Sequence, residues 1–232
     1  MVLEDIAKKE KWNEFLAYKM EKEFVPRKEK KELEEFIQNE EYAEICAQIA
    51  NQTYSFSIPE KHLISKGHSG KKRTVYTFSK KEMMALKLLS YLLYDYDDLF
   101  SPNLYSFRKN SSVKTAIRNI SNIKNISKMY GYKVDISNYF NSIDTSILMT
   151  HLQRDIADKK LLKLFDSLLQ SDEATYHGKL LTEQKGVMAG TPISAFLANY
   201  YIKEIDEYFW NQNVVYARYA DDIICFVIRR KN

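Results

Sequence analysis

Two apolar segments near the C-terminus, residues 214–219 and 223–228, are separated by only Ala220, Asp221 and Asp222. Both segments are rich in β-branched and aromatic residues, so the pattern predicts two strands joined by a tight hairpin turn. The turn holds two neighbouring carboxylates between apolar strands, which costs free energy unless something offsets their charge. A divalent cation bound by oxygen ligands is the usual solution. The alternative is a turn with two solvated aspartates, because Asp is common in turns.

A third carboxylate, Asp135, ends another predicted strand at residues 130–136. Three carboxylates on neighbouring strands could hold two Mg²⁺ ions about 4 Å apart, and Mn²⁺ could substitute for Mg²⁺. Such a pair of ions activates a 3′-hydroxyl as nucleophile and stabilises the departing pyrophosphate. The carboxylates therefore favour nucleotidyl transfer.

Positive charge is concentrated in two parts of the chain. Residues 61–87 carry eight basic residues and one acidic residue, and residues 99–134 carry seven basic residues and no acidic residue, although the net charge of the whole chain is only +4. This segregation predicts a face that binds a polyanion such as nucleic acid. An ordinary solvated surface is the alternative.

The order of predicted elements favours an α+β fold over regular βαβ winding. Helices are expected over most of residues 1–50, a hairpin at 64–78, and helices at 80–96, 112–128, 144–156 and 159–170. A loop or small hairpin follows at 174–190, then one long helix at 192–211 and the acidic hairpin. The 45% hydrophobic content is enough for a substantial core. No apolar run approaches the roughly 18 residues of a membrane helix. With two cysteines and no signal peptide, the chain is expected to be cytoplasmic, without a membrane partner.

Several motifs, in this order, resemble those of bacterial reverse transcriptases such as the group II intron, retron and phage-defence enzymes. Lys133–Phe140 resembles the first palm motif, Gly186–Ser194 with Leu197–Asn199 the next, and Tyr219–Asp222 the family signature. Leu104–Arg108 resembles a fingers motif that usually reads Gly-Phe-Arg, with Ser106 in place of Gly. The resemblance covers residues 58–228 and implies a right-hand polymerase fingers and palm, in which a small antiparallel palm sheet packs on helices.

The resemblance also implies a role for each matched residue in the catalytic centre. Asp135 and Asp221 are expected to bind both Mg²⁺ ions, with Asp222 as an outer ligand and the Ile136 carbonyl completing one site. Phe140 would exclude a ribose 2′-hydroxyl by shape. Core packing is the alternative for Phe140.

The remaining roles concern nucleotide and nucleic-acid binding. Lys66 and Arg73, seven residues apart, would pair with the triphosphate, unless they belong to a plain surface hairpin. Gly190 would allow close approach of the nucleotide. Ala189 stands where most members carry Gln, which makes loose base selection a hypothesis. Arg108, Lys114 and Arg118 would contact the phosphate backbone.

The expected organisation is a helical N-terminal extension (1–57), fingers (58–130) and a palm (131–232) interleaved with fingers around 150–190. No thumb is expected within this sequence, so a thumb-bearing partner or a further C-terminal segment would hold the duplex. The expected function is RNA-directed DNA synthesis from a DNA or RNA primer with dNTPs. Phage defence is one biological role that such synthesis could serve. The alternatives are a template-independent DNA polymerase on the same fold and a non-catalytic nucleic-acid-binding module or inactive fragment.

Overall fold

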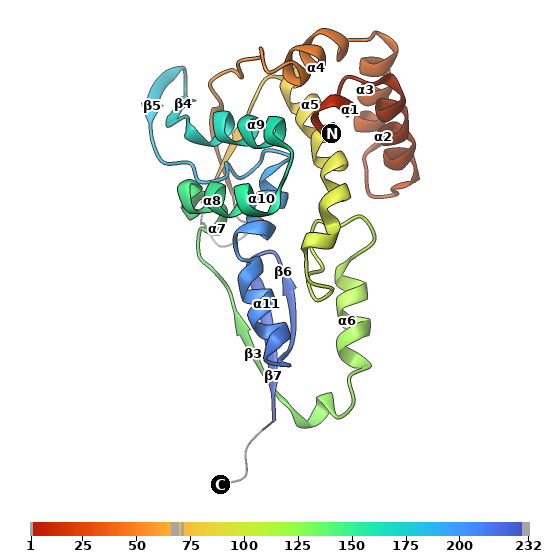
Figure 1. Ribbon diagram of the computed structural model, residues 1–232, viewed down its shortest axis with the longest axis vertical. Coiled ribbons are helices and arrows are strands. Elements are labelled where there is room, and N and C mark those ends of the chain that lie inside the picture. The colour runs from red at the N-terminus through yellow and green to blue at the C-terminus, as the bar shows by residue number, and fades with distance from the viewer. Residues whose placement is uncertain (1, 66–69, 71, 229–232) are drawn as a thin grey trace.

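A computed structural model describes residues 2–65, 70 and 72–228 of the chain. Figure 1 shows a helical upper part and a narrower lower part built around a small sheet. Helices at the N-terminus are α1 (Val2–Asp5), α2 (Lys9–Glu21), α3 (Arg27–Gln38) and α4 (Ala43–Ala50). The later helices are α5 (Lys80–Leu92), α6 (Val113–Ser121), α7 (Tyr139–Ser142), α8 (Thr145–Asp155), α9 (Lys159–Gln170), α10 (Ser194–Tyr201) and α11 (Lys203–Asn211). The α+β fold class is confirmed.

The strands form two sheets. The first has the order β2-β1-β4-β5, from β1 (Glu60–Ser65), β2 (Lys72–Thr77), β4 (Glu173–Tyr176) and β5 (Lys179–Thr182). The second, the palm sheet, is antiparallel with the order β3-β7-β6, from β3 (Tyr130–Val134), β6 (Val215–Tyr219) and β7 (Asp222–Val227). In Figure 1 the palm sheet lies in the lower part, beside α11 and α6.

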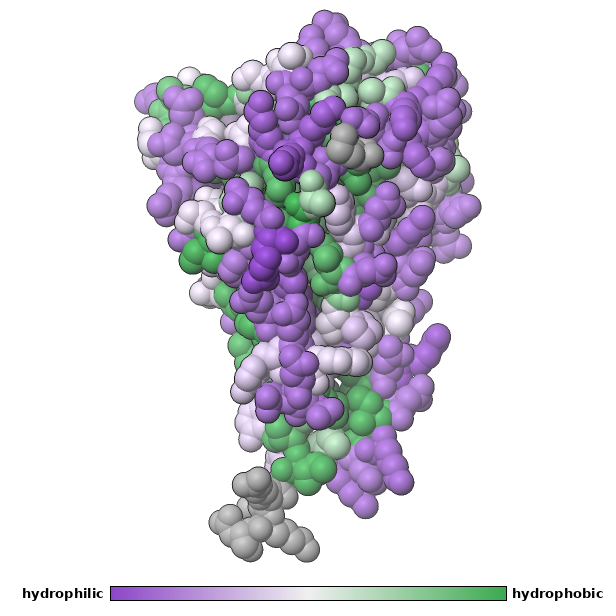
Figure 2. Space-filling view, in the orientation of Figure 1, coloured by the Kyte–Doolittle hydropathy of each residue, from purple (hydrophilic) through white to green (hydrophobic). Residues whose placement is uncertain are grey.

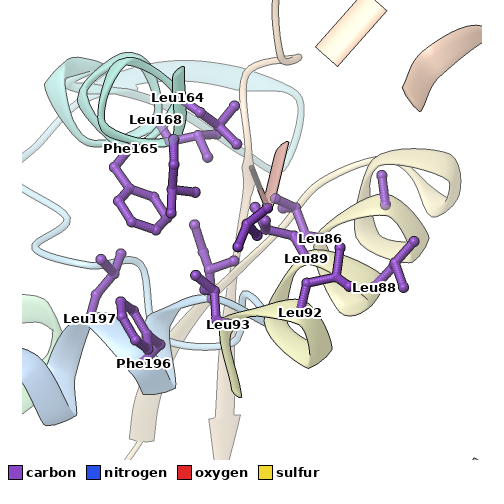
Figure 3. Close-up of a cluster of buried hydrophobic side chains, with 14 of the residues drawn as sticks. Leu86, Leu88, Leu89, Leu92, Leu93, Leu164, Phe165, Leu168, Phe196 and Leu197 are labelled. Atoms are coloured by element: carbon purple, nitrogen blue, oxygen red, sulfur yellow. The ribbon is translucent and has the colours of Figure 1, made fainter. Parts of the chain in front are cut away.

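A continuous hydrophobic core joins the N-terminal helices to the rest of the chain. Trp12 and Phe15 of α2 are buried in the same cluster as the leucines of α5. Figure 3 shows another part of this cluster, where α5 residues such as Leu89 face Phe165 of α9 and Phe196 of α10. Helix α5 therefore has neighbours on two sides, and the core lies directly above the palm sheet.

The start of α5 is fixed by local hydrogen bonds. Ser79 caps the helix by accepting from the Glu82 amide, and the Glu82 carboxylate accepts from the Ser79 amide. The same buried carboxylate also accepts from the backbone and hydroxyl of Ser57, both at 2.6 Å. Glu82 thus ties the segment before β1 to the core.

Three predicted helices differ from the observed ones. The helix predicted over 80–96 is α-helical only as far as Leu92 and continues as a 3₁₀ helix over Leu93–Leu99. The helix predicted over 192–211 is divided into α10 and α11, because Ile202 leaves helical geometry at φ −107° and ψ 19°. The helix predicted over 112–128 ends as α6 at Ser121, and Asn125 then adopts a left-handed conformation before one 3₁₀ turn. Asn tolerates that conformation better than most residues.

Charged and polar residues cover much of the face shown in Figure 2. Within the described residues, no helix is both long and apolar enough to cross a membrane.

Candidate active site

The pairing of the palm strands places the three predicted carboxylates at one end of the sheet. Val134, the last residue of β3, pairs with Ile223 of β7, and Asp135 follows it immediately. Tyr219 pairs with Asp222, so Ala220 and Asp221 alone form the turn between β6 and β7. Neighbouring strands lie about 5 Å apart. The sheet therefore brings Asp135 beside the Asp221-Asp222 turn, from positions far apart in the sequence.

The charge of this cluster acts on a neighbouring lysine. Lys133 Nζ lies 2.8 Å from Asp222 Oδ1 on the exposed surface of the sheet. This hydrogen bond, together with the charges of Asp222, Asp135 and Asp221, raises the pKa of Lys133. Asp222 is thus turned toward a cation of the protein, whereas Asp135 and Asp221 form no ion pair with any side chain in the described part of the chain.

The oxygen ligands of this site suit Mg²⁺, because two carboxylates are enough to hold that ion. Within residues 2–65, 70 and 72–228, no three His, Cys, Asp or Glu side chains are gathered into a ready cation cage. Magnesium in proteins is usually held by one or two carboxylates, with water and substrate phosphates completing its shell. Asp135, Asp221 and the carbonyl of Ile136 supply oxygen ligands of this kind, so the residues present fit the ion.

The carboxylates open onto a cleft of about 1160 Å³. Eight of the residues predicted to act in catalysis or nucleotide binding line it: Arg73, Asp135, Ile136, Phe140, Ala189, Gly190, Asp221 and Asp222. Arg73 is exposed on β2 and lines the same cleft as the carboxylates. Lys66, its predicted partner in triphosphate binding, lies outside the described residues.

The loop that carries Ala189 and Gly190 is packed tightly against β2. The Ala189 carbonyl accepts from the Tyr76 amide at 2.7 Å. Gly190 has φ +103°, and a Cβ added there would lie 3.0 Å from the Tyr76 carbonyl oxygen and from Val75 Cβ. Glycine is therefore required at residue 190 by the chain's own packing, as well as by any approach of a nucleotide.

The side chain of Asn141, for which the sequence predicts no role, also binds this loop. Asn141 Oδ1 accepts from the Ala189 amide at 3.1 Å, and Asn141 Nδ2 donates to the Thr74 carbonyl at 3.1 Å. The amide of Val187 donates to the Phe140 carbonyl at 2.9 Å. Asn141 follows the predicted gate residue directly, but nothing in its local sequence indicates these distant partners.

Aromatic rings form one wall of the cleft. Phe140 is half-buried and meets Phe107 edge to face at 6.5 Å between ring centroids, and Phe107 lies 6.4 Å from the Tyr219 ring. Phe107 is 50% exposed and has φ +54°, an unfavourable backbone conformation for a bulky residue. Phe107 belongs to the Leu104–Arg108 motif, but the sequence predicts no role for it. The structure adds it to the cleft wall.

The neighbour of Phe140 anchors this wall. Tyr139 is buried, and its hydroxyl donates to the Ala198 carbonyl at 2.5 Å. Burial raises the pKa of Tyr139 well above its ordinary value, so this hydroxyl stays protonated as a donor.

Of the residues predicted to contact the phosphate backbone, Arg108 is engaged elsewhere. Its guanidinium pairs with both carboxylate oxygens of Asp97 at 2.8 Å and donates to the Ser101 carbonyl at 2.7 Å. These bonds make Arg108 a clamp on its own loop rather than a free phosphate ligand. Lys114 and Arg118 are exposed on one face of α6, four residues apart.

Comparison with known proteins agrees with this geometry. Residues 58–232 match the family model described as reverse transcriptase (RNA-dependent DNA polymerase). The chain belongs to the reverse transcriptase family. At the level of the family, this assigns it to the RNA-directed DNA polymerases, a class of nucleotidyltransferase.

Individual relatives support the assignment over parts of their length. The Retron Ec73 reverse transcriptase of Escherichia coli is 30% identical over 186 residues, covering 72% of this chain and 52% of that protein. A 91 kDa protein in the cob intron of Schizosaccharomyces pombe is 27% identical over 169 residues, covering 72% of this chain and 20% of that protein. A chain of the solved partial Cas6-RT-Cas1–Cas2 complex shares the fold, with a TM-score of 0.54, 16% identity, and coverage of 100% of this chain and 39% of that chain. This reverse transcriptase chain thus spans about half or less of the length of these relatives.

Proposed function

We propose that this chain carries the catalytic centre of an RNA-directed DNA polymerase that extends a DNA or RNA primer with dNTPs on an RNA template. The single observation that carries the proposal is the meeting of Asp135 with the Asp221-Asp222 turn at the floor of the cleft. Asp135, Asp221 and the Ile136 carbonyl would bind two Mg²⁺ ions, with Asp222 as an outer ligand. When bound, these ions supply activation of the 3′-hydroxyl and charge neutralisation at the phosphates.

The other residues of the cleft would bind and orient the reactants. Arg73, which lines the cleft, would pair with the triphosphate as a bidentate cation. Lys114 and Arg118 on α6 would hold the phosphate backbone. The ring wall of Phe140, Phe107 and Tyr219 offers apolar surface to sugars and bases.

The test is primer extension by the protein with an RNA template, a labelled primer, dNTPs and Mg²⁺ or Mn²⁺. Template-directed products support the proposal. Tailing with a single dNTP in the absence of template would identify the template-independent polymerase instead. Tight binding of primer–template without any product, with both metals, would identify the non-catalytic module.

A first prediction concerns the choice of sugar. The Phe140 ring lies on the cleft wall beside Asp135. Replacing it by Ala should weaken discrimination against ribonucleotides by about 10- to 100-fold, because the space for a 2′-hydroxyl is opened. Competition between a dNTP and the matching NTP measures this ratio. Phe140→Tyr keeps the ring and should stay near wild type; unchanged discrimination in Phe140→Ala would remove Phe140 from the role of gate.

A second prediction concerns fidelity. Ala189 lines the cleft with a methyl group that can neither donate nor accept a hydrogen bond. We propose that base selection is loose for this reason and that Ala189→Gln should lower misincorporation roughly 10-fold. Sequencing of copied products measures the error rate. Equal error rates in the wild type and in Ala189→Gln, with Ala189→Ser as a control for packing, would contradict the proposal.

The cellular setting is also a proposal. We propose that the protein works in the cytoplasm and with a further duplex-binding element, supplied by a thumb-bearing partner or by a further C-terminal segment. A role in phage defence is consistent with its family and can be tested by phage plating on cells that carry the intact gene. Protection that is lost in the Asp221→Asn strain would support defence by synthesis, and equal plating on both strains would contradict it.

A further inference from the structure

A fully buried hydroxyl, that of Ser106, contacts the turn that carries Asp221. Ser106 Oγ accepts from the Ala220 amide at 2.7 Å and donates to Asn199 Oδ1 at 3.1 Å. Asn199 Nδ2 in turn donates to the Ser106 carbonyl at 3.0 Å. Serine and asparagine, 93 residues apart in the sequence, thus form a closed pair directly behind the turn.

Ala220, whose amide Ser106 contacts, has an unfavourable backbone conformation. Ala220 has φ +56°, a left-handed conformation that alanine rarely adopts. Ala220 and Asp221 are the only two residues between the paired positions Tyr219 and Asp222. A change in the backbone dihedral angles of Ala220 would therefore move the Asp221 carboxylate.

The next peptide group, between Ala220 and Asp221, is held by a buried ion pair. Arg218 Nη1 donates to the Ala220 carbonyl at 3.2 Å, and Arg218 Nε donates to Asp206 Oδ2 at 2.9 Å. Arg218 Nη2 also donates to the Asn199 carbonyl at 3.1 Å. The amide of Ala220 thus binds Ser106 and its carbonyl binds Arg218, and both of these side chains are buried in the core.

The segment around Ser106 is attached to the same hairpin by its backbone. The Tyr105 amide donates to the Arg218 carbonyl, and the Arg218 amide donates to the Asn103 carbonyl, both at 2.9 Å. The position of the hydroxyl is therefore set by strand-like pairing with β6 and does not depend on a mobile rotamer alone.

We propose that Ser106 is a positioning residue for the reaction: by holding the Ala220 amide it fixes the direction of the Asp221 carboxylate toward the cleft. This inference rests on the proposed polymerase function for its kinetic consequence, and on the hydrogen bonds above for its structural one. A glycine at this position, as in the related fingers motif, has no side chain that could make the contact.

The test uses Ser106→Ala, with Ser101→Ala as the matched control. Ser101 Oγ bonds Tyr216 of the same strand at 2.8 Å but does not touch the turn. In the protein without substrate, hydrogen exchange of the Ala220 amide should become about tenfold faster in Ser106→Ala and stay unchanged in Ser101→Ala. In primer extension, kcat should fall about 10- to 100-fold in Ser106→Ala, while KM for dNTP stays near wild type.

The results test the positioning role of Ser106 independently of the proposed polymerase function. Unchanged Ala220 exchange in Ser106→Ala overturns it, whether or not the wild type polymerises. Faster exchange with an unaltered kcat in an active enzyme also overturns it, because the turn would then not need this restraint. If Ser106→Ala does not fold, Ser106→Cys keeps a group of similar size with a weaker acceptor. The cysteine variant should show intermediate exchange and kcat, and wild-type values for both would again overturn the proposal.

Discussion

Replacing Asp221 by Asn should lower the rate of primer extension by at least about 10³-fold. The substitution keeps the size of the side chain and removes its charge, so a metal ligand loses several kcal/mol of electrostatic stabilisation in the transition state. The folded structure should tolerate the change, because Asp221 is only half-buried at the turn. Rates under single-turnover conditions measure the effect, and circular dichroism checks the fold.

A graded series of carboxylate variants makes this prediction sharper. Asp135→Asn should match Asp221→Asn, whereas Asp222→Asn should cost less, because Asp222 is paired with Lys133 at 2.8 Å. Asp172→Asn changes an exposed carboxylate away from the cleft and should leave the rate unaltered. Extension by Asp221→Asn at near wild-type speed would mean that the catalytic centre lies elsewhere.

Replacing Arg218 by Met should lower the free energy of unfolding by about 3–5 kcal/mol. Arg218 is 0% exposed and its partner Asp206 is 1% exposed, so the substitution leaves a carboxylate buried without its cation. The loss is a large part of the 5–15 kcal/mol that stabilises an ordinary domain. Urea denaturation followed by circular dichroism measures it.

Two further variants separate the buried charge from ordinary packing. Arg218→Met combined with Asp206→Leu removes both charges and should recover much of the stability, because no unpaired ion remains. Arg108→Met breaks a partly exposed pair with Asp97 and should cost less than Arg218→Met. A loss below about 1 kcal/mol in Arg218→Met would show that Asp206 finds another partner or a proton.

Local patterns in the sequence were sufficient for the α+β class and the acidic hairpin, whereas β3 ends at Val134, two residues before the predicted end at residue 136. Apolar strand-forming residues and a short acidic turn are short-range features, so they predict strands and their carboxylates without knowledge of the core. The turn itself consists of Ala220 and Asp221, while Asp222, predicted in the turn, begins β7. No Gly or Pro marks the helix break at Ile202, which divides a continuous apolar pattern into α10 and α11. Tertiary packing decides such a break, which propensity alone does not show.

The supporting contacts of the site were the least predictable part. Ser106, Asn199 and Ala220 each lie in a recognisable motif, but nothing in these motifs indicates that the three residues contact one another. Arg108 lies in an entirely basic stretch, which suggested a phosphate ligand, but a single acid outside that stretch, Asp97, takes its guanidinium. A sequence pattern indicates which functional side chains are present, whereas the fold determines which of them already bind one another.

The shared core also limits how this polymerase can be trimmed or recombined. Helix α2 packs against α5, where the Phe15 ring lies 5.4 Å from the Tyr91 ring, and Phe165 of α9 and Phe196 of α10 face α5 as well. Deleting the first four helices would expose a leucine-rich surface in the middle of the molecule and promote aggregation. Gene fusions that preserve the N-terminal helices leave the protein's architecture intact, whereas exchanges that replace them require a new cover for α5.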